Sequence, residues 1–262
     1  MHAQYAMARQ SSHERMLRVL DMIEESARPL TSDDMADRLG FTRSTLYRHL
    51  KNLSDAGLVT SFPDVGYALG PRIAELDYRM RNSDPLIIAS RPVMAELAEA
   101  RAGIALLCRR YRDRVLCVHQ ESRNASFAST YERGRALPLF KGAASRIILA
   151  HLPARSIQRL YQTDRRAFAE GGMGKSLDAV KANLKAMRQR GWDITESQVT
   201  RGVTGIAAPI FDDRGTVLGS LSLTVGRTRL AEAEIQAIAE RVAFCARIVT
   251  KALSGHIPSI IP

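Results

Sequence analysis

The sequence contains little cysteine, a single tryptophan and no long hydrophobic run. Its three cysteines, among 262 residues, form no CxxC pair, which argues against a thiolate metal site or a disulfide framework. We expect Cys108, Cys117 and Cys245 to be small apolar core residues. Cys108 and Cys117 lie on neighbouring predicted strands, where a conditional disulfide is the alternative, but nothing else in the sequence supports it. No apolar run approaches the roughly 18 residues of a membrane-spanning helix. Residues 1–16 also lack the apolar core of a signal peptide, so we expect a cytoplasmic protein with no membrane partner.

The six histidines are scattered and show none of the HxH, HxxE or HExxH spacings. Those spacings place ligands or acid–base groups on one face of an element, so their absence gives no support to a metal site or a catalytic centre. We therefore expect no cofactor, no metal and no enzymatic activity.

The net charge of +11 suggests an anionic partner, but its distribution does not identify the binding region. Residues 1–70 carry 8 Lys and Arg against 9 Asp and Glu, a net charge of −1, and the rest of the chain carries +12. A nucleic-acid site in the first 70 residues must therefore rest on local pattern.

The first 70 residues contain the signals of three helices followed by a hairpin. Ser11-x-x-Glu14 is a capping box, Thr31-x-x-Asp34 begins a short second helix, and Gly40 ends it as a left-handed cap would. The predicted elements are helices over 12–27, 31–39 and 42–56 and strands over 58–60 and 67–69. This order predicts a winged helix-turn-helix, in which the third helix enters the DNA major groove and the wing around Pro63 approaches the flanking backbone.

Hydrogen-bond donors crowd the outer face of the third predicted helix, and residues 41–51 contain no acid. Arginine and lysine pair with guanine edges and phosphates, and serine and threonine with either. We expect the DNA-binding residues to be Thr42, Arg43, Ser44, Thr45, Tyr47, Arg48 and Lys51. The alternative is a small helical bundle that binds a protein or caps the next domain.

Beyond residue 70 the pattern changes to a short amphipathic helix and then a mixture of helices and strand pairs. We divide the chain into a winged helix-turn-helix at 1–70, a linker helix at 71–85 and a second domain at 86–254. Its predicted strands cover 104–110, 115–120, 126–130, 203–211 and 216–225, and its predicted helices 86–102, 143–151, 176–191 and 231–253. This pattern predicts an α+β domain, with helices packed on an antiparallel sheet.

Residues 169–176 fit a relaxed phosphate-loop pattern with Lys175 and Ser176 in the nucleotide-binding places. A phosphate loop follows a buried strand, whereas residues 163–168 are charged and not strand-like. We interpret Ser176 as the N-cap of the next helix. A nucleotide hydrolase that uses Lys175 and Ser176 remains the enzymatic alternative.

The chain resembles the IclR family of bacterial transcription regulators from about Ser12 to Leu253. The matching stretches are residues 42–50 with Gly57-Leu58-Val59, then Tyr67-Ala68-Leu69-Gly70-Pro71, Leu137-Pro138-Leu139, Leu149-Ala150, Arg190-Gly191-Trp192 and residues 202–212. The resemblance implies a linker helix and a GAF/PAS-like effector-binding domain with an antiparallel sheet. It also implies a dimer or dimer of dimers on a palindromic operator, regulated by a small organic acid.

The glycine and alanines of Gly142-Ala143-Ala144-Ser145 lie where a loop enters a predicted helix, so a ligand carboxylate could reach free backbone N–H groups. Close packing is the alternative explanation. Carried over by position, the resemblance implies an effector site formed by Ser129, Leu137, Ala143, Ala144, Thr195, Val203, Gly205, Ser222 and Thr224. Ser222 and Thr224 share a strand face and can present both hydroxyls, unless these are solvated or bonded to backbone.

This sequence departs from the family pattern at two positions of the implied site and at one neighbouring position. Some members have an acid where this chain has Thr195 and a cysteine where it has Gly205, and a frequent acid is replaced by Gln198. Less charge and more room suit a larger, anionic effector, aromatic acids included. We interpret the chain as a ligand-responsive DNA-binding regulator, with a protein-binding sensor module as a further alternative.

Overall fold

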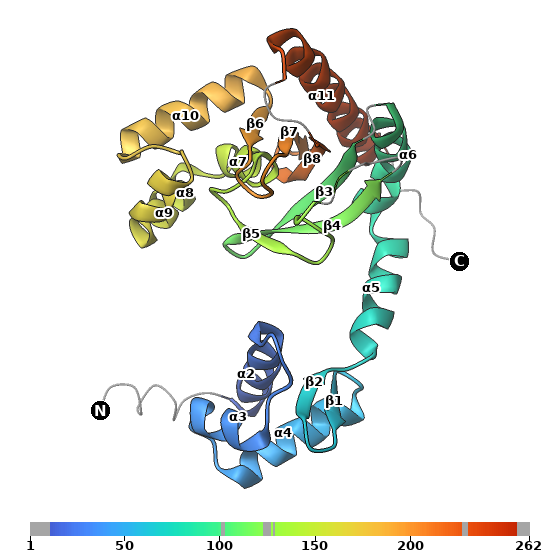
Figure 1. The fold of residues 1–262 in the computed structure, drawn as a ribbon, viewed down its shortest axis with the longest axis vertical. Coiled ribbons are helices and arrows are strands. Elements are labelled where there is room, and N and C mark those ends of the chain that lie inside the picture. The colour runs from blue at the N-terminus through green and yellow to red at the C-terminus, as the bar shows by residue number, and fades with distance from the viewer. Residues whose placement is uncertain (1–10, 101–102, 123–126, 128, 227–229, 256–262) are drawn as a thin grey trace. The chain divides into compact units, whose positions relative to one another are not determined.

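A computed structural model describes residues 11–100, 103–122, 127, 129–226 and 230–255. The chain forms two compact units that divide between Asn82 and Ser83, and each has a core of its own (Figure 1). Within the described ranges, no helix is both long enough and apolar enough to cross a membrane.

The N-terminal unit contains three helices and a two-stranded hairpin, as predicted. Its elements are α2 (Ser12–Glu25), α3 (Ser32–Leu39), α4 (Arg43–Asp55), β1 (Val59–Phe62) and β2 (Gly66–Leu69). One buried stripe from each helix forms the core, which includes Val19, Met35, Leu46 and Leu50. The capping box is present, because Ser11 Oγ accepts from Glu14 N and the Glu14 carboxylate accepts from Ser11 N.

The turn between α3 and α4 is set by local chemistry. Gly40 ends α3 at φ 66°, a left-handed conformation that glycine adopts without a Cβ clash. Thr31 caps α3 and Thr42 caps α4 through their side-chain oxygens. Two caps and one glycine thus fix where α4 begins and how it leaves the turn.

The hairpin is anchored against the chain that leads into α3. Leu30 and Tyr67 exchange backbone hydrogen bonds of 3.0 and 2.8 Å. Gly66, at φ 126°, lies so close that a Cβ there would be 2.5 Å from Leu30 O. No side chain other than hydrogen fits this position, so the wing stays attached to the helical core.

Helix α5 (Arg72–Ser83) has no buried side chain and leads to α6 (Pro85–Ala100). Its turns carry ion pairs of 2.9 Å between Arg79 and Glu75 and 3.1 Å between Arg81 and Asp77. Pairs at this spacing stabilise a helix by a few tenths of a kcal/mol each.

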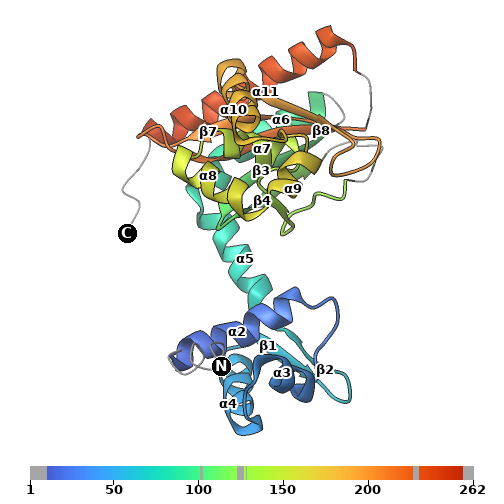
Figure 2. The ribbon, with the colours of Figure 1, turned by 90° about the vertical axis from the view of Figure 1, so that its left-hand side faces the viewer.

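The C-terminal unit is built on one antiparallel sheet with helices on both faces (Figure 2), which confirms the predicted α+β class. The strand order is β5-β4-β3-β8-β7-β6, with β3 (Ile104–Tyr111), β4 (Arg114–Ser122), β5 (Ala136–Pro138), β6 (Asp193–Glu196), β7 (Thr204–Phe211) and β8 (Val217–Val225). Helices α6 and α11 (Glu232–Gly255) pack on one face. The other face carries α7 (Ala143–Ala150), with α8 (Ala154–Thr163), α9 (Arg165–Glu170) and α10 (Leu177–Arg190) completing its layer.

Alternation along the central strands sorts side chains between these two layers. On β8, Leu221 and Leu223 pack with α6 and α11, whereas Ser222 and Thr224 point to the α7 side. On β7, Ile206 and Ala208 belong to the first layer and Gly205 to the second. Because successive strand residues face opposite sides, the α7 face acquires small and hydroxyl-bearing residues in the middle of the sheet.

Several predictions for the C-terminal unit need correction or addition. The described residues of 126–130, namely 127, 129 and 130, are not in a strand, and residues 126 and 128 lie outside the described part. Helices α8 and α9 and strands β5 and β6 were not predicted. The segment before the phosphate-loop pattern is helix α9, not a strand, and Ser176 caps α10 by accepting from Ala179 N at 3.2 Å. The phosphate-loop alternative therefore lacks its required framework.

Cysteine chemistry is as expected from the sequence. Cys108, Cys117 and Cys245 are buried and have free thiols. Cys108 and Cys117 face each other on β3 and β4. The hydrogen bond with Cys108, followed by burial, raises the pKa of Cys117, and burial raises the pKa of Cys245, so these two thiols stay protonated.

Candidate functional site

The outer face of α4 presents an acid-free set of donors. Six of the seven predicted DNA-binding residues are exposed and Thr45 is half-buried. Tyr47 is 67% exposed, which is unusual for an aromatic side chain and leaves its ring and hydroxyl available to a partner. The opposite face holds Leu46, Leu50 and Leu53 in the core, so α4 is anchored from behind while its donors point outward.

The first turn of α4 is organised by its own hydroxyls. Thr42 Oγ1 accepts from Thr45 N at 3.3 Å and donates to Thr45 Oγ1 at 2.9 Å, so both side chains are partly occupied by the cap. Arg43 lies 3.2 Å from Asp33 of α3, with both side chains mostly exposed. An exposed pair of this kind contributes only about 0.2–1 kcal/mol, so a phosphate can displace Asp33.

The inner side of α4 holds a neutral imidazole. His49 is 1% exposed and its ring meets Phe41 edge-on, with centroids 6.0 Å apart. Burial first, and then the charges of Arg48 and Arg15, lower the pKa of His49. The cationic character of α4 therefore comes from Arg43, Arg48 and Lys51.

The wing contributes little charge. Residues 52–70 contain no lysine or arginine. Its tip exposes Phe62 and Val65, and Asp64 adopts φ 57°, a left-handed conformation that aspartate tolerates in turns. Contacts from this hairpin to a phosphate backbone would have to use peptide N–H groups or hydroxyls.

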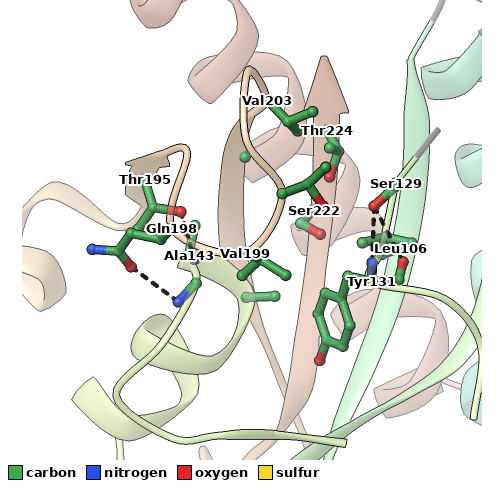
Figure 3. A pocket seen from close by; sticks show the side chains of 14 residues that line it. Leu106, Ser129, Tyr131, Ala143, Thr195, Gln198, Val199, Val203, Ser222 and Thr224 are labelled. Carbon is green, nitrogen blue, oxygen red and sulfur yellow. Dashed lines mark hydrogen bonds between the residues drawn. The ribbon is translucent and has the colours of Figure 1, made fainter. Parts of the chain in front are cut away.

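A small cavity of about 40 Å³ lies between α7 and the centre of the sheet (Figure 3). A water needs about 10–15 Å³ measured in this way, so the cavity has room for about three. Eight of the nine predicted effector residues line it, namely Ser129, Ala143, Ala144, Thr195, Val203, Gly205, Ser222 and Thr224. The family resemblance thus pointed to residues that are up to 95 positions apart and that the fold brings together.

Leu137 does not line the cavity. It lies on β5, is 6% exposed and packs in the core behind Gly142, where a Cβ would be 3.9 Å from Leu137 Cδ1. The sequence analysis had not pointed to four lining residues, Leu106, Tyr131, Val199 and Thr200, whereas it had named Gly142 for its backbone and Gln198 as a departure from the family pattern. Val199 and Thr200 belong to a loop without periodicity, so no pattern singled them out.

The beginning of α7 faces the cavity with its backbone donors already engaged. Gly142, at φ 82°, is the N-cap residue and offers no side chain to cap the helix. Its N–H donates to Gln198 Oε1 at 3.1 Å, and Ala143 N–H donates to Thr195 Oγ1 at 3.1 Å. Two neutral side-chain oxygens thus occupy the positive end of the helix dipole, where an anion would bind.

The loop between β6 and β7 covers the cavity and is held by specific bonds. Gln198 Nε2 donates to Gly171 O at 3.2 Å, and Thr200 Oγ1 lies 2.9 Å from Thr130 N and 2.7 Å from Thr130 Oγ1. Val199 reaches across so that a Cβ on Gly142 would be 2.8 Å from its Cγ2. A ligand larger than a few waters therefore requires this loop to move.

The hydroxyls on the sheet side differ in how well they are bonded. Ser222 Oγ is buried without a hydrogen-bond partner. Ser129 Oγ accepts from Tyr131 N at 3.1 Å, and Tyr131 donates its phenol to Val115 O at 3.3 Å. A buried hydroxyl without a partner costs about 1–3 kcal/mol, which makes Ser222 the group most ready to bond a ligand.

The described residues that line the cavity include no Lys, Arg, His, Asp or Glu. Burial first, and then the neighbouring Cys108, raise the pKa of Tyr131, so its phenol stays neutral. Outside this lining, an ion pair joins α7 to β6. Arg146 of α7 lies 2.9 Å from Asp193 of β6, where burial raises the carboxyl pKa and Arg146 opposes that rise. This pair ties the cavity helix to the strand that carries Thr195.

Comparison with known proteins assigns both units. A profile of helix-turn-helix domains matches residues 12–61, and the profile described as "Bacterial transcriptional regulator IclR C-terminal" matches residues 79–251. The transcriptional regulator XynR of Escherichia coli is 25% identical over 245 residues, which span 92% of this chain and 96% of XynR.

Two solved structures share the fold. An IclR regulator from Alicyclobacillus acidocaldarius has a TM-score of 0.79 at 20% identity and covers 94% of this chain and all of its own. An IclR homologue from Microbacterium hydrocarbonoxydans, solved with 4-hydroxybenzoate, has a TM-score of 0.73 at 19% identity and covers 93% of this chain and 99% of its own.

The domain order, the outward-facing donors on α4 and the profile that matches most of the chain agree with one another. The protein is a transcriptional regulator with a helix-turn-helix domain and an effector-binding domain, and it belongs to the IclR family.

Proposed function

We propose that α4 lies in the major groove of a palindromic operator, that two copies of the chain bind its half-sites, and that a small organic acid in the cavity modulates this binding. The observation that carries the DNA part is the exposed face of α4 over residues 42–51, which contain no acid. Arg43, Ser44, Thr45, Tyr47 and Arg48 contact bases and phosphates, while Thr42 and Lys51 position the helix.

Symmetric binding follows from the small number of contacts that one unit can make. One helix and a wing without lysine or arginine supply too few contacts for tight specific binding. Two helices reading half-sites one or more helical turns apart, roughly 34–36 Å per turn, double the contacts. We therefore propose a homodimer or a dimer of dimers as the DNA-binding form.

The effector part rests on the beginning of α7. A carboxylate can take the places of Gln198 Oε1 and Thr195 Oγ1 on the Gly142 and Ala143 N–H groups, where it gains charge-assisted bonds that neutral oxygens do not provide. Across the cavity, Ser222 offers its unused hydroxyl to the other end of the ligand. The 4-hydroxybenzoate of the Microbacterium homologue carries a carboxylate and a hydroxyl at opposite ends.

Regulation requires that the ligand distinguish two states of the protein. An effector shifts a conformational equilibrium only by its difference in affinity for the two forms. Displacing Gln198 breaks its bonds to both Gly142 and Gly171, so ligand binding releases the β6–β7 loop from two other segments. We propose this release as the local difference between the two states.

Operator selection from random duplexes, followed by a salt titration of binding, tests the DNA part. Arg48→Ala should weaken binding to the selected duplex about tenfold or more per half-site, because one good contact to a base contributes about 1–3 kcal/mol. Arg28→Ala removes another exposed charge, between α2 and α3, and serves as the control. Equal effects of the two changes would contradict a reading role for α4.

A thermal-shift series tests the effector part. We expect 4-hydroxybenzoate to raise the melting temperature, and 4-hydroxybenzamide, which keeps the shape and loses the charge, to raise it less. Ser222→Ala should reduce the shift from 4-hydroxybenzoate but not that from benzoate, which lacks the distal hydroxyl. If 4-hydroxybenzamide raised the melting temperature as much as 4-hydroxybenzoate, the beginning of α7 would not be the carboxylate site.

A further inference from the structure

Two neighbouring hollows on the C-terminal unit share two lining residues, His151, which follows the last turn of α7, and Arg188 of α10. One, of about 440 Å³, lies against α8 and α10, and the other, of about 380 Å³, lies against β7 and α11. Neither has a lining residue in common with the effector cavity. Their sizes are those of pockets that hold small molecules. We call the two hollows together the basic groove.

The walls of the basic groove carry one sign of charge. Lys181, Lys185 and Arg188 follow one face of α10 at i, i+4 and i+7, and Arg247 and Lys251 follow α11 at i and i+4. No Asp or Glu is among the described residues that line either hollow.

These cations lack the partners that other cations in the same unit have. Lys181 has a distant contact of 3.9 Å to Asp178, and the other four are in no ion pair with a carboxylate of the described part of the chain. By contrast, Arg159 holds Asp113 at 2.9 Å and Arg166 holds Glu170 at 2.6 Å. The groove therefore keeps positive charge that the fold does not neutralise.

Two groups at the junction of the hollows are held in place. Arg188 Nη1 donates to Ala150 O at 2.6 Å, which fixes the guanidinium and leaves its other N–H groups for a ligand. The His151 ring meets Phe211 edge-on at 4.9 Å, and its buried Nε2 has no hydrogen-bond partner. Guanidinium and ammonium groups gathered around one hollow are the combination that proteins use for phosphates.

The floor of the groove is apolar, with Leu152, Ile157 and Leu184 on one side and Ala208, Pro209 and Phe211 on the other. We propose that the basic groove binds a small phosphorylated anion with two or more negative charges, either a nucleoside polyphosphate whose base covers the apolar floor or a free polyphosphate. This site is independent of the proposed effector cavity and of operator binding.

Calorimetric titration of the full chain with ATP, AMP and tripolyphosphate, at one fixed ionic strength, tests the proposal. We expect saturable 1:1 binding of ATP or tripolyphosphate, at least tenfold tighter than that of AMP. Tighter binding of ATP than of tripolyphosphate would identify the nucleotide, and equal binding the free polyphosphate, and both results support the site.

Charge reversal of Lys185 and Lys251 together tests the location. Lys185→Glu with Lys251→Glu should weaken binding at least tenfold, and the milder pair Lys185→Gln with Lys251→Gln should weaken it less. Both side chains are exposed, so the melting temperature without ligand should not change. Lys175→Glu is the matched control, because this exposed lysine lies in the phosphate-loop pattern outside the groove.

Three results would overturn the proposal. They are no saturable binding of either polyphosphate, unchanged binding after the double reversal, and an equal loss of affinity in Lys175→Glu. The last result would show general attraction to a basic protein rather than a site in the basic groove.

Discussion

The two units of this regulator place their candidate sites in opposite ways. In the N-terminal unit the site is the outside of a single helix, and the core behind α4 serves only to hold it. In the C-terminal unit the site is enclosed, and its lining comes from β3, α7, β6, β7, β8 and the loops beside them. A surface that reads a long rigid polymer can be one helix face, whereas a site that surrounds a small molecule needs walls from many segments.

The two candidate sites also differ in charge, and each differs from the net charge of its part of the chain. Residues 1–70 have a net charge of −1, yet the face of α4 is locally positive, because Arg43, Arg48 and Lys51 have no acid among residues 41–51. The rest of the chain has a net charge of +12, yet no charged side chain is among the described residues lining the effector cavity. Net charge therefore locates neither site, and the local arrangement of donors decides both.

The largest expected effect is on the free energy of unfolding, and it tests whether the two units unfold independently. Leu50→Ala should destabilise the N-terminal unit by about 2–5 kcal/mol, because a core leucine leaves a cavity when it is truncated. Leu184→Ala, at an equally buried position of α10, should lower the stability of the C-terminal unit instead. Calorimetry should show two transitions that respond separately, and a joint shift would contradict two independent cores.

The next largest expected effect is on effector affinity, and it comes from a side chain that fills the effector cavity. A Cβ on Gly205 would lie 3.9 Å from Thr195 Oγ1 and 4.0 Å from Thr224 Oγ1, which are ordinary contacts. Gly205→Val should therefore fold and weaken effector binding at least tenfold, about 1.4 kcal/mol, because the side chain occupies ligand space. Gly205→Ala should weaken it less, and DNA binding without effector should stay within twofold. Unchanged effector affinity in the valine variant would place the ligand elsewhere.

A smaller effect probes the neutral side chain that occupies the helix terminus. Gln198→Ala frees the Gly142 N–H group, so we expect carboxylate effectors to bind a few times more tightly. Gln198→Glu places a fixed negative charge there and should weaken the same ligands by a similar factor. Titrations of both variants with one acid give the comparison, and changes of the same sign would show that Gln198 does not compete with the ligand.

The smallest expected effect is on DNA binding by the exposed face of α4. Asp33→Asn releases Arg43 from an ion pair in which both side chains are mostly exposed, so DNA affinity should rise two- to fivefold at low salt. Asp37→Asn removes a charge from the same helix without touching that pair and is the control. The gain should disappear as salt rises, and a gain that persists at high salt would contradict an electrostatic origin.

Much of the N-terminal unit could be predicted because its signals are local. Ser11, Thr31 and Thr42 cap helices where the spacing indicates, and Gly40 ends α3 as expected. Each of these groups bonds to backbone within three or four residues, so neighbouring sequence contains the whole interaction. The exposed face of α4 follows from the same helical period that buries Leu46 and Leu50.

The prediction failed where long-range contacts decide the structure. Strand β6 begins with Asp193, a charged residue that is 1% exposed and that a strand pattern would place on the surface. Arg146, 47 residues earlier on α7, makes its burial possible. Helix α8 was missed despite a local signal, since Ile157 and Tyr161 are buried one turn apart after Pro153.

The sequence by itself determined the helix-turn-helix, the outward donors of α4 and the fact that Ser222 and Thr224 share one strand face, because caps and side-chain periods act over a few residues. Only the tertiary structure decided that Gln198 occupies the beginning of α7, that Leu137 lies behind the cavity and that α10 and α11 gather unpaired cations. These features join segments tens of residues apart, and their bonds form only when the sheet brings those segments together.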